Sequence, residues 1–181
     1  MLVRQKIPGT GLNSLRITRI FLLVLFVISL LAGCNYKFNQ TTIPPEIKTV
    51  RVQFIENNAR YRNPQLSPQL TDKLRQKIVS QTKLTQVNGE NADYDISGSI
   101  TQYDVSTSGI SNQQVATNRL TVAVSLILND RKTGKEPRNI SASRNFDFSA
   151  SLTLQQAERQ LNDEIIRNLT DEIFNQLFSN W

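Results

Sequence analysis

Few side chains in this chain of 181 residues carry distinctive chemistry, and the most notable is its single cysteine, Cys34. The chain contains no histidine, so it lacks Ser–His and Cys–His nucleophile pairs and the commonest transition-metal ligand. It also lacks phosphate-binding glycine loops and other catalytic motifs. We therefore predict no enzymatic activity, no metal site and no cofactor. A pair of carboxylates could still support hydrolysis, which keeps a carboxylate-dependent enzyme as an alternative.

Cys34 ends a segment with the layout of a secretory signal. Four basic residues precede an apolar stretch, 20–31, of about twelve residues, fewer than the roughly twenty that span a bilayer. The run Leu31-Ala32-Gly33-Cys34 resembles the lipobox of bacterial lipoproteins. The resemblance implies that signal peptide 1–33 is removed and that Cys34 becomes the acylated first residue. The alternative is an uncleaved apolar helix with a chance cysteine.

Lipidation at Cys34 would decide where the protein resides. Each buried methylene contributes roughly 0.8 kcal/mol, so two or three acyl chains, such as palmitate, make membrane attachment effectively permanent. In the familiar sorting rule an acidic residue after the cysteine retains a lipoprotein at the inner membrane. Asn35 stands there instead, which predicts lipid anchoring to the outer membrane on its periplasmic side.

The basic character of the chain comes mostly from its first 33 residues. Four of the 21 Lys and Arg residues lie there and none of the 15 Asp and Glu residues does, leaving 17 cations against 15 anions. This balance does not indicate a nucleic-acid partner. Beyond a lipidated linker, 34–48, we predict one compact domain over 49–181.

Alternating apolar residues predict about four principal strands. The first contains Val50, Val52 and Phe54, and a short strand is possible over 85–87. Three longer strands follow, at 94–105, 119–129 and 140–149. The apolar phase of the first of these changes near Thr101-Gln102, which predicts a β-bulge. In the last, Arg144 lies in the apolar phase and needs an edge position or a partner.

Helical spacing of apolar residues predicts two helices. The first begins with Ser67 as N-cap and Pro68 at the first helical position. Its apolar residues are Leu70, Leu74, Ile78 and the neighbouring Val79. The second runs over 153–180, with Thr153 and Gln156 as a capping box. Its stripe consists of Leu154, Ala157, Leu161, Ile165, Leu169, Ile173 and Leu177.

The order β-α-β-β-β-α predicts an α+β two-layer sandwich, in which two helices pack on one face of a mostly antiparallel sheet of about four strands. The other face is rich in Ser, Thr and Asn, with few large charged groups. Two interpretations remain open. The face could be an ordinary solvated sheet, or it could lie against a polar partner surface.

Several sequence blocks together resemble the LptE family of outer-membrane lipopolysaccharide-assembly lipoproteins. The blocks are Cys34-Asn35-Tyr36-Lys37-Phe38, Ile43-Pro44, Lys48-Thr49-Val50, Phe54 with Asn57-Asn58-Ala59, Leu66-Ser67-Pro68, Asn118-Arg119-Leu120-Thr121-Val122, Ile173-Phe174-Asn175 and Trp181. They cover nearly the whole chain after the signal, and their order and spacing carry the resemblance. It implies a protein without enzymatic activity that plugs and helps assemble the LptD β-barrel and takes part in lipopolysaccharide transport to the outer leaflet. The alternative is a periplasm-facing lipoprotein of another envelope complex that binds a peptide or a glycan.

Lipid A carries phosphates, for which Arg and Lys are natural donors. The loop 130–139 concentrates four cations, and these are our candidates for contact with lipopolysaccharide or a partner: Arg131, Lys132, Lys135 and Arg138. The alternative is a solvated hairpin connection. Arg119 is a fifth candidate, for lipid phosphate or the barrel wall, with cross-strand pairing as the alternative.

Three aromatic residues near the end of the chain also allow two interpretations. Phe174, Phe178 and Trp181 lie at or beside the edge of the apolar stripe of the second helix. They could anchor a partner, because aromatic residues are enriched at interfaces, or they could complete the core at the end of that helix.

Overall fold

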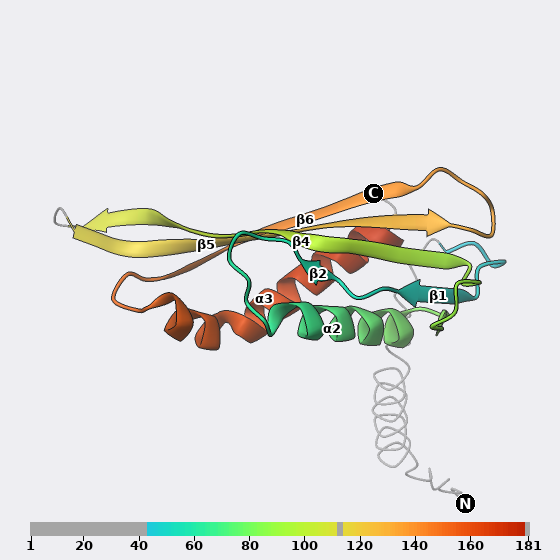
Figure 1. Cartoon of the computed structure of the whole chain (residues 1–181), viewed down its shortest axis with the longest axis horizontal. Helices are drawn as coiled ribbons and strands as arrows, with labels where there is room; N and C mark the ends of the chain where they lie inside the picture. Colours follow the sequence, from blue (N-terminus) through green and yellow to red (C-terminus); the bar gives the residue numbers. More distant parts are fainter. Residues whose placement is uncertain (1–42, 112–113, 180–181) are drawn as a thin grey trace, which may run out of the picture. The chain divides into compact units, whose positions relative to one another are not determined.

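The computed structural model describes residues 43–111 and 114–179. The predicted signal peptide, Cys34, most of the 34–48 linker and Trp181 therefore lie outside the described residues. Within these two ranges, six strands and two helices follow one another (Figure 1). They are β1 (Thr49–Val52), β2 (Glu56–Asn57), α2 (Leu66–Gln81), β3 (Thr85–Gln86), β4 (Tyr94–Ser111), β5 (Gln114–Asp130), β6 (Arg138–Ser149) and α3 (Leu154–Phe178).

The strands form one mixed sheet in the order β3-β1-β4-β5-β6, and β2 pairs with β4. The long strands β4, β5 and β6 are antiparallel, whereas β1 is parallel to β3 and to β4. The α+β class and the two helices are confirmed, but the prediction of about four mostly antiparallel strands was partly wrong. Helix α2 returns the chain to the starting end of β1, so the strands that follow, β3 and β4, run parallel to β1. Strand β3 confirms the possible short strand over 85–87, whereas β2 was not predicted and has two residues, too few for a pattern that identifies a strand.

The β-bulge predicted in β4 is present. The pairing with β5 shifts register between Ile100 and Gln102. The extra residue, Thr101, allows Ile100 and Tyr103 to share the buried face although they are three positions apart; their exposed fractions are 0% and 2%.

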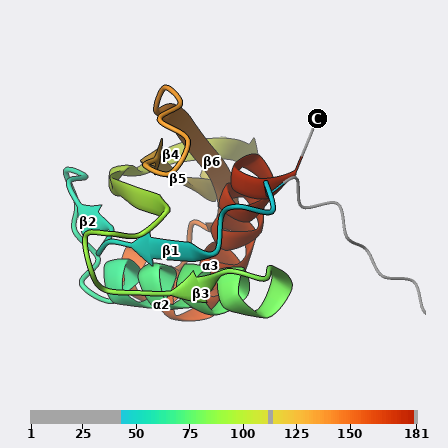
Figure 2. The same cartoon turned by 90° about the vertical axis from the view of Figure 1, so that its right-hand side faces the viewer.

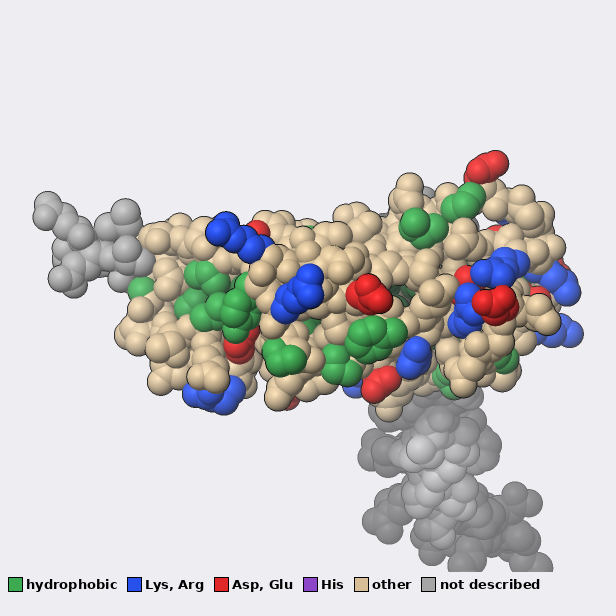
Figure 3. Space-filling model, viewed as in Figure 1, with side chains coloured by type: hydrophobic (Ala, Val, Ile, Leu, Met, Phe, Trp, Pro, Cys, Tyr) green, Lys and Arg blue, Asp and Glu red, His purple; other side chains and the backbone are tan. Residues whose placement is uncertain are grey.

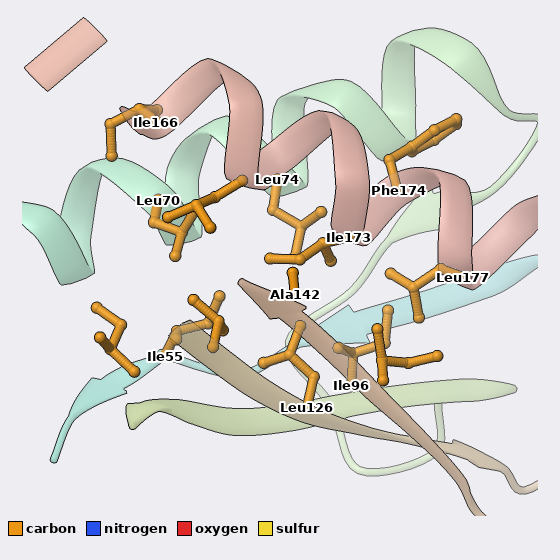
Figure 4. Close-up of a cluster of buried hydrophobic side chains, with 14 of the residues drawn as sticks. Ile55, Leu70, Leu74, Ile96, Leu126, Ala142, Ile166, Ile173, Phe174 and Leu177 are labelled. Atoms are coloured by element: carbon orange, nitrogen blue, oxygen red, sulfur yellow. The ribbon is translucent and has the colours of Figure 1, made fainter. Parts of the chain in front are cut away.

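Both helices cover one face of the sheet and lie side by side (Figure 2). The core lies between the two layers, where Leu70 and Leu74 of α2 and Ile173 of α3 face Ile96 and Leu126 of the sheet (Figure 4). Strand β5 alternates as predicted, with five apolar residues buried: Leu120, Val122, Val124, Leu126 and Leu128. The other residues of β5 alternate with these and point to the opposite face of the sheet.

The N-terminus of α3 was predicted correctly from the sequence, but that of α2 was not. Thr153 and Gln156 form the predicted capping box at α3. The N-cap prediction for α2 was wrong, because the helix begins at Leu66 with Gln65 as N-cap. Ser67 is a buried helical residue whose carbonyl accepts a hydrogen bond from Thr71 Oγ1. Pro68 is still tolerated because the first four N–H groups of a helix have no partner within it.

Two predicted core positions are exposed. Phe54 is 54% exposed and Val79 is 49% exposed. Strand β1 ends at Val52, so the alternation does not continue to Phe54, and Ile55 is buried in its place. Near the end of α3, Phe174 and Phe178 are buried and contact each other with ring centroids 5.2 Å apart. Packing in the core is therefore the correct interpretation of these two rings.

Candidate functional site

The face of the sheet opposite the helices is a polar surface formed by β4, β5 and β6. Its side chains are mostly short and uncharged, and include Ser97, Ser99, Thr121, Ala123, Ser125, Ser141, Ser143 and Asn145. Thr121 Oγ1 donates to Asn145 Oδ1 across β5 and β6 at 2.8 Å. Ile127 is the exposed large hydrophobic residue on this face, at 40%. This open face is therefore polar without being strongly charged.

Arg119 lies on the open face and pairs with Asp147, its neighbour across β5 and β6. Its Nε and Nη2 donate to the two carboxylate oxygens at 2.7 and 2.9 Å. The hydrogen bonds from Arg119 hold the pKa of Asp147 below its usual value. Arg119 therefore makes the cross-strand pair that was the alternative interpretation from sequence. Because its charge is paired with that of Asp147, this guanidinium adds little net charge to the face.

A buried carboxylate, Asp95, organises the end of the open face near the β5–β6 connection. It is 2% exposed and accepts hydrogen bonds from Arg51 at 2.8 and 3.1 Å, from Gln53 at 3.1 and 3.2 Å, and from Arg131 at 2.6 Å. Burial alone would raise the pKa of Asp95, but the hydrogen bonds from Arg51 and the other two donors outweigh it, and the pKa is lowered. Sequence reasoning missed this centre.

The four cations of the β5–β6 connection do not form one cluster. Arg131 binds Asp95 and donates to the Glu90 carbonyl, and Lys132 Nζ lies 3.8 Å from a carboxylate oxygen of Asp93. Arg138 donates to the Leu177 carbonyl at 2.6 Å, where a cation complements the C-terminal end of α3. Charged side chains gather toward this end of the molecule (Figure 3). Most of them serve contacts within the fold.

Lys135 differs from these three cations. Among the described residues it has no hydrogen-bond or ion-pair partner, and it lines a pocket of about 460 Å³ with Arg138. The walls of this pocket are both apolar and charged, formed by Ile43, Pro44, Tyr94, Leu128, Leu177, Phe178, Asp130 and Glu136. Cations beside an apolar wall can hold a ligand that carries both a phosphate and a hydrocarbon.

Arg144 has both of the features that the sequence predicted as alternatives, an edge position and a charged partner. It lies on the edge strand β6 and forms an ion pair with Glu172 of α3. Gln176, on the same helix, donates to the Ser141 carbonyl at 2.9 Å and accepts from the Ser141 N–H at 3.3 Å. These contacts join the edge strand β6 to α3. The side chains of Arg144, Glu172 and Gln176 therefore have a structural role and do not indicate a binding site.

Several lipoproteins of known structure are similar to this chain. In solved structures, rare lipoprotein B from Shewanella oneidensis is 14% identical, covering 72% of this chain and 93% of its own, with a TM-score of 0.49. Lipoprotein B from Nitrosomonas europaea is 16% identical over 80% and 88%, with a TM-score of 0.49. A minor lipoprotein from Acinetobacter baumannii is 17% identical over 75% and 97%, with a TM-score of 0.41. No curated protein sequence matches.

Within the described ranges, neither helix combines the length and apolar character needed to cross a bilayer. The family model described as "LptE: Lipopolysaccharide-assembly" matches residues 47–177, which include every strand that the structure describes, helix α2, and all of α3 except Phe178. The family resemblance seen in the sequence blocks is thereby confirmed: the chain belongs to the LptE family of lipopolysaccharide-assembly proteins.

Proposed function

We propose that this protein is an outer-membrane lipoprotein, anchored through Cys34, that seats its open face against the inner wall of an LptD-like β-barrel during lipopolysaccharide assembly. The observation that carries the proposal is the composition of that face. Short Ser, Thr and Asn side chains cover it, and its guanidinium groups at 51, 119 and 131 are paired with carboxylates. A barrel lumen is polar and hydrated, so a surface of this kind suits it better than an apolar patch or an uncompensated charge.

Bulky charges placed on the open face should disrupt this contact. We expect Ser125→Arg and Ser143→Arg, separately and together, to reduce the amount of barrel that co-purifies with the tagged protein in mild detergent by at least about tenfold for the pair, because two unpaired buried cations cost several kcal/mol. Ser80→Arg, on the exposed side of α2, is the matched control and should co-purify like the parent. Equal recovery with all variants would contradict the proposed role of the face.

For lipopolysaccharide itself, we propose the pocket beside Lys135 as the contact with lipid phosphate. Of the candidates named from sequence, Lys135 has no hydrogen-bond or ion-pair partner among the residues that the structure describes. Lys132 lies three positions earlier in the chain, and its Nζ is 3.8 Å from a carboxylate oxygen of Asp93. Arg119, Arg131 and Arg138 instead bind groups of the fold, so they stabilise the site more than they contact a ligand.

Reversing the charge at Lys135 should weaken this contact. We expect Lys135→Glu to lower the affinity for lipopolysaccharide about fivefold, the size of an exposed ion pair of about 1 kcal/mol, and Lys132→Glu to add a smaller loss. Titration of the full-length protein with labelled lipopolysaccharide measures both. Lys83→Glu, an exposed reversal after α2, controls for net charge. A loss of the same size in Lys83→Glu would show that the effect is not local.

A further inference from the structure

A second polar hollow lies where the loop before α2 meets the first turns of α3, and its wall includes Tyr61, the outer ring of a pair of stacked tyrosines. The rings of Tyr61 and Tyr103 are 5.5 Å apart between centroids, with 29° between their planes. Tyr103 is buried at 2% exposure, whereas Tyr61 is 43% exposed. The buried ring therefore holds the outer ring in one orientation while Tyr61 keeps much of its surface toward solvent.

Glu158 of α3 is fixed beside these rings by hydrogen bonds. Its Oε1 accepts from Tyr103 Oη at 2.8 Å and from Asn63 Nδ2 at 3.1 Å. Its Oε2 lies 3.5 Å from Tyr61 Oη, at the limit of a hydrogen bond. One carboxylate oxygen is thus occupied, and the other retains capacity to accept from a ligand. Burial raises the pKa of Tyr103 above its usual value, so its hydroxyl remains a donor to Glu158.

Tyr61, Asn63 and Glu158 border a hollow of about 460 Å³, and Tyr103 lies behind Tyr61. Further along its wall lie amide and guanidinium groups, those of Gln155, Arg159 and Asn162. The volume is in the range of small-molecule sites. An acyl chain does not suit this wall, which is polar apart from Tyr61 and Pro64. A bare anion does not suit it either, because two carboxylates, Glu158 and Asp163, and one guanidinium, that of Arg159, are among the residues that line it.

A saccharide matches all of these features. The C–H face of a pyranose ring is apolar and packs against an exposed aromatic ring, while its hydroxyl groups both donate and accept hydrogen bonds. We propose that Tyr61, Asn63 and Glu158 form the centre of a saccharide-binding site, with Tyr61 as the stacking platform and Glu158 Oε2 as an acceptor for sugar hydroxyls. The site is separate from the open face and from the pocket of Lys135, so the inference does not depend on barrel binding.

The test is titration of the full-length lipidated protein into fluorescently labelled oligosaccharides, followed by anisotropy. The detergent must lack a sugar headgroup, for example lauryldimethylamine oxide. Two probes distinguish the sources: the delipidated core oligosaccharide of lipopolysaccharide, and an N-acetylglucosamine tetrasaccharide that represents cell-wall glycan. Binding of either supports the site and identifies its source. If neither binds, or if inorganic phosphate displaces the bound sugar, the proposal is overturned.

Variants locate the binding. We expect Tyr61→Ala to weaken it at least roughly tenfold, because the stacking surface is lost, and Tyr61→Phe to change it little. Phe54→Ala removes another aromatic side chain that is more than half exposed and should leave binding unchanged. A similar loss in Phe54→Ala, or full binding by Tyr61→Ala, would overturn the assignment. Barrel co-purification of Tyr61→Ala reports separately on the open face, so the two proposals can fail independently.

Discussion

Replacing Gly98 by alanine should lower the free energy of unfolding by about 3 kcal/mol or more, which is among the largest effects expected of a single methyl group. Gly98 lies in β4 with φ of +153°, and a Cβ at this position would be 2.2 Å from the Ser125 carbonyl oxygen of β5. Both atoms belong to the centre of the sheet, so neither can move without breaking the β4–β5 pairing. Chemical denaturation followed by circular dichroism measures the change.

Gly89→Ala is the matched control for Gly98→Ala. Gly89 lies in the turn before β4, and no atom lies within 4 Å of the position that a Cβ would take. This substitution should change stability by less than about 1 kcal/mol, with slight stabilisation possible through the unfolded chain. Equal midpoints for the two variants would show that the close approach of β4 to β5 is not as described.

Removing the carboxylate of Asp95 should destabilise the protein by about 3 kcal/mol, because it leaves the guanidinium groups of Arg51 and Arg131 without their shared partner. Arg131 is partly solvated, at 44% side-chain exposure, which keeps the expected loss at the lower end of the range for buried ion pairs. Asp104→Ala is the control, since Asp104 lies exposed on the same strand. It should change stability by less than about 0.5 kcal/mol.

The same carboxylates give the stability an acid dependence of defined sign. The pKa values of Asp93, Asp95 and Asp147 are lowered in the folded protein, so the unfolded chain binds protons more readily. Their contribution is complete well above the unfolded value of about 4 and is lost as pH falls through the lower folded values. The free energy of unfolding should therefore decline below about pH 4, and Asp95→Ala should decline less. An unchanged acid slope in Asp95→Ala would contradict the network.

Features that depend on a few neighbouring residues were predictable from the sequence. The alternation of β5, the capping box of Thr153 and the bulge after Ile100 each follow from a pattern within one segment. Where a pattern is interrupted the prediction failed, as at Phe54, because the end of β1 depends on how the chain turns toward β2 rather than on its own alternation.

The candidate site was less predictable, because it depends on register between distant segments. Arg51 and Arg131 are 44 and 36 residues from Asp95 in sequence, and only the β1–β4 alignment and the position of the β5–β6 connection bring them together. The cations near 131–138 looked like one cluster in sequence, yet a carboxylate of β4 and a carbonyl of α3 divide them. Asp95 lies in the polar phase of β4, between Tyr94 and Ile96, and nothing in this pattern indicated that it would be buried.

Site-specific photo-crosslinking in cells tests the central claim most directly. A photoreactive residue at position 125 or 143 lies on the open face, and one at position 80 lies on the outer side of α2. If the open face rests against the barrel wall, ultraviolet light should join the protein to a large outer-membrane β-barrel from positions 125 and 143. The account would be contradicted if neither position 125 nor position 143 gave a crosslink to that barrel, or if position 80 alone did.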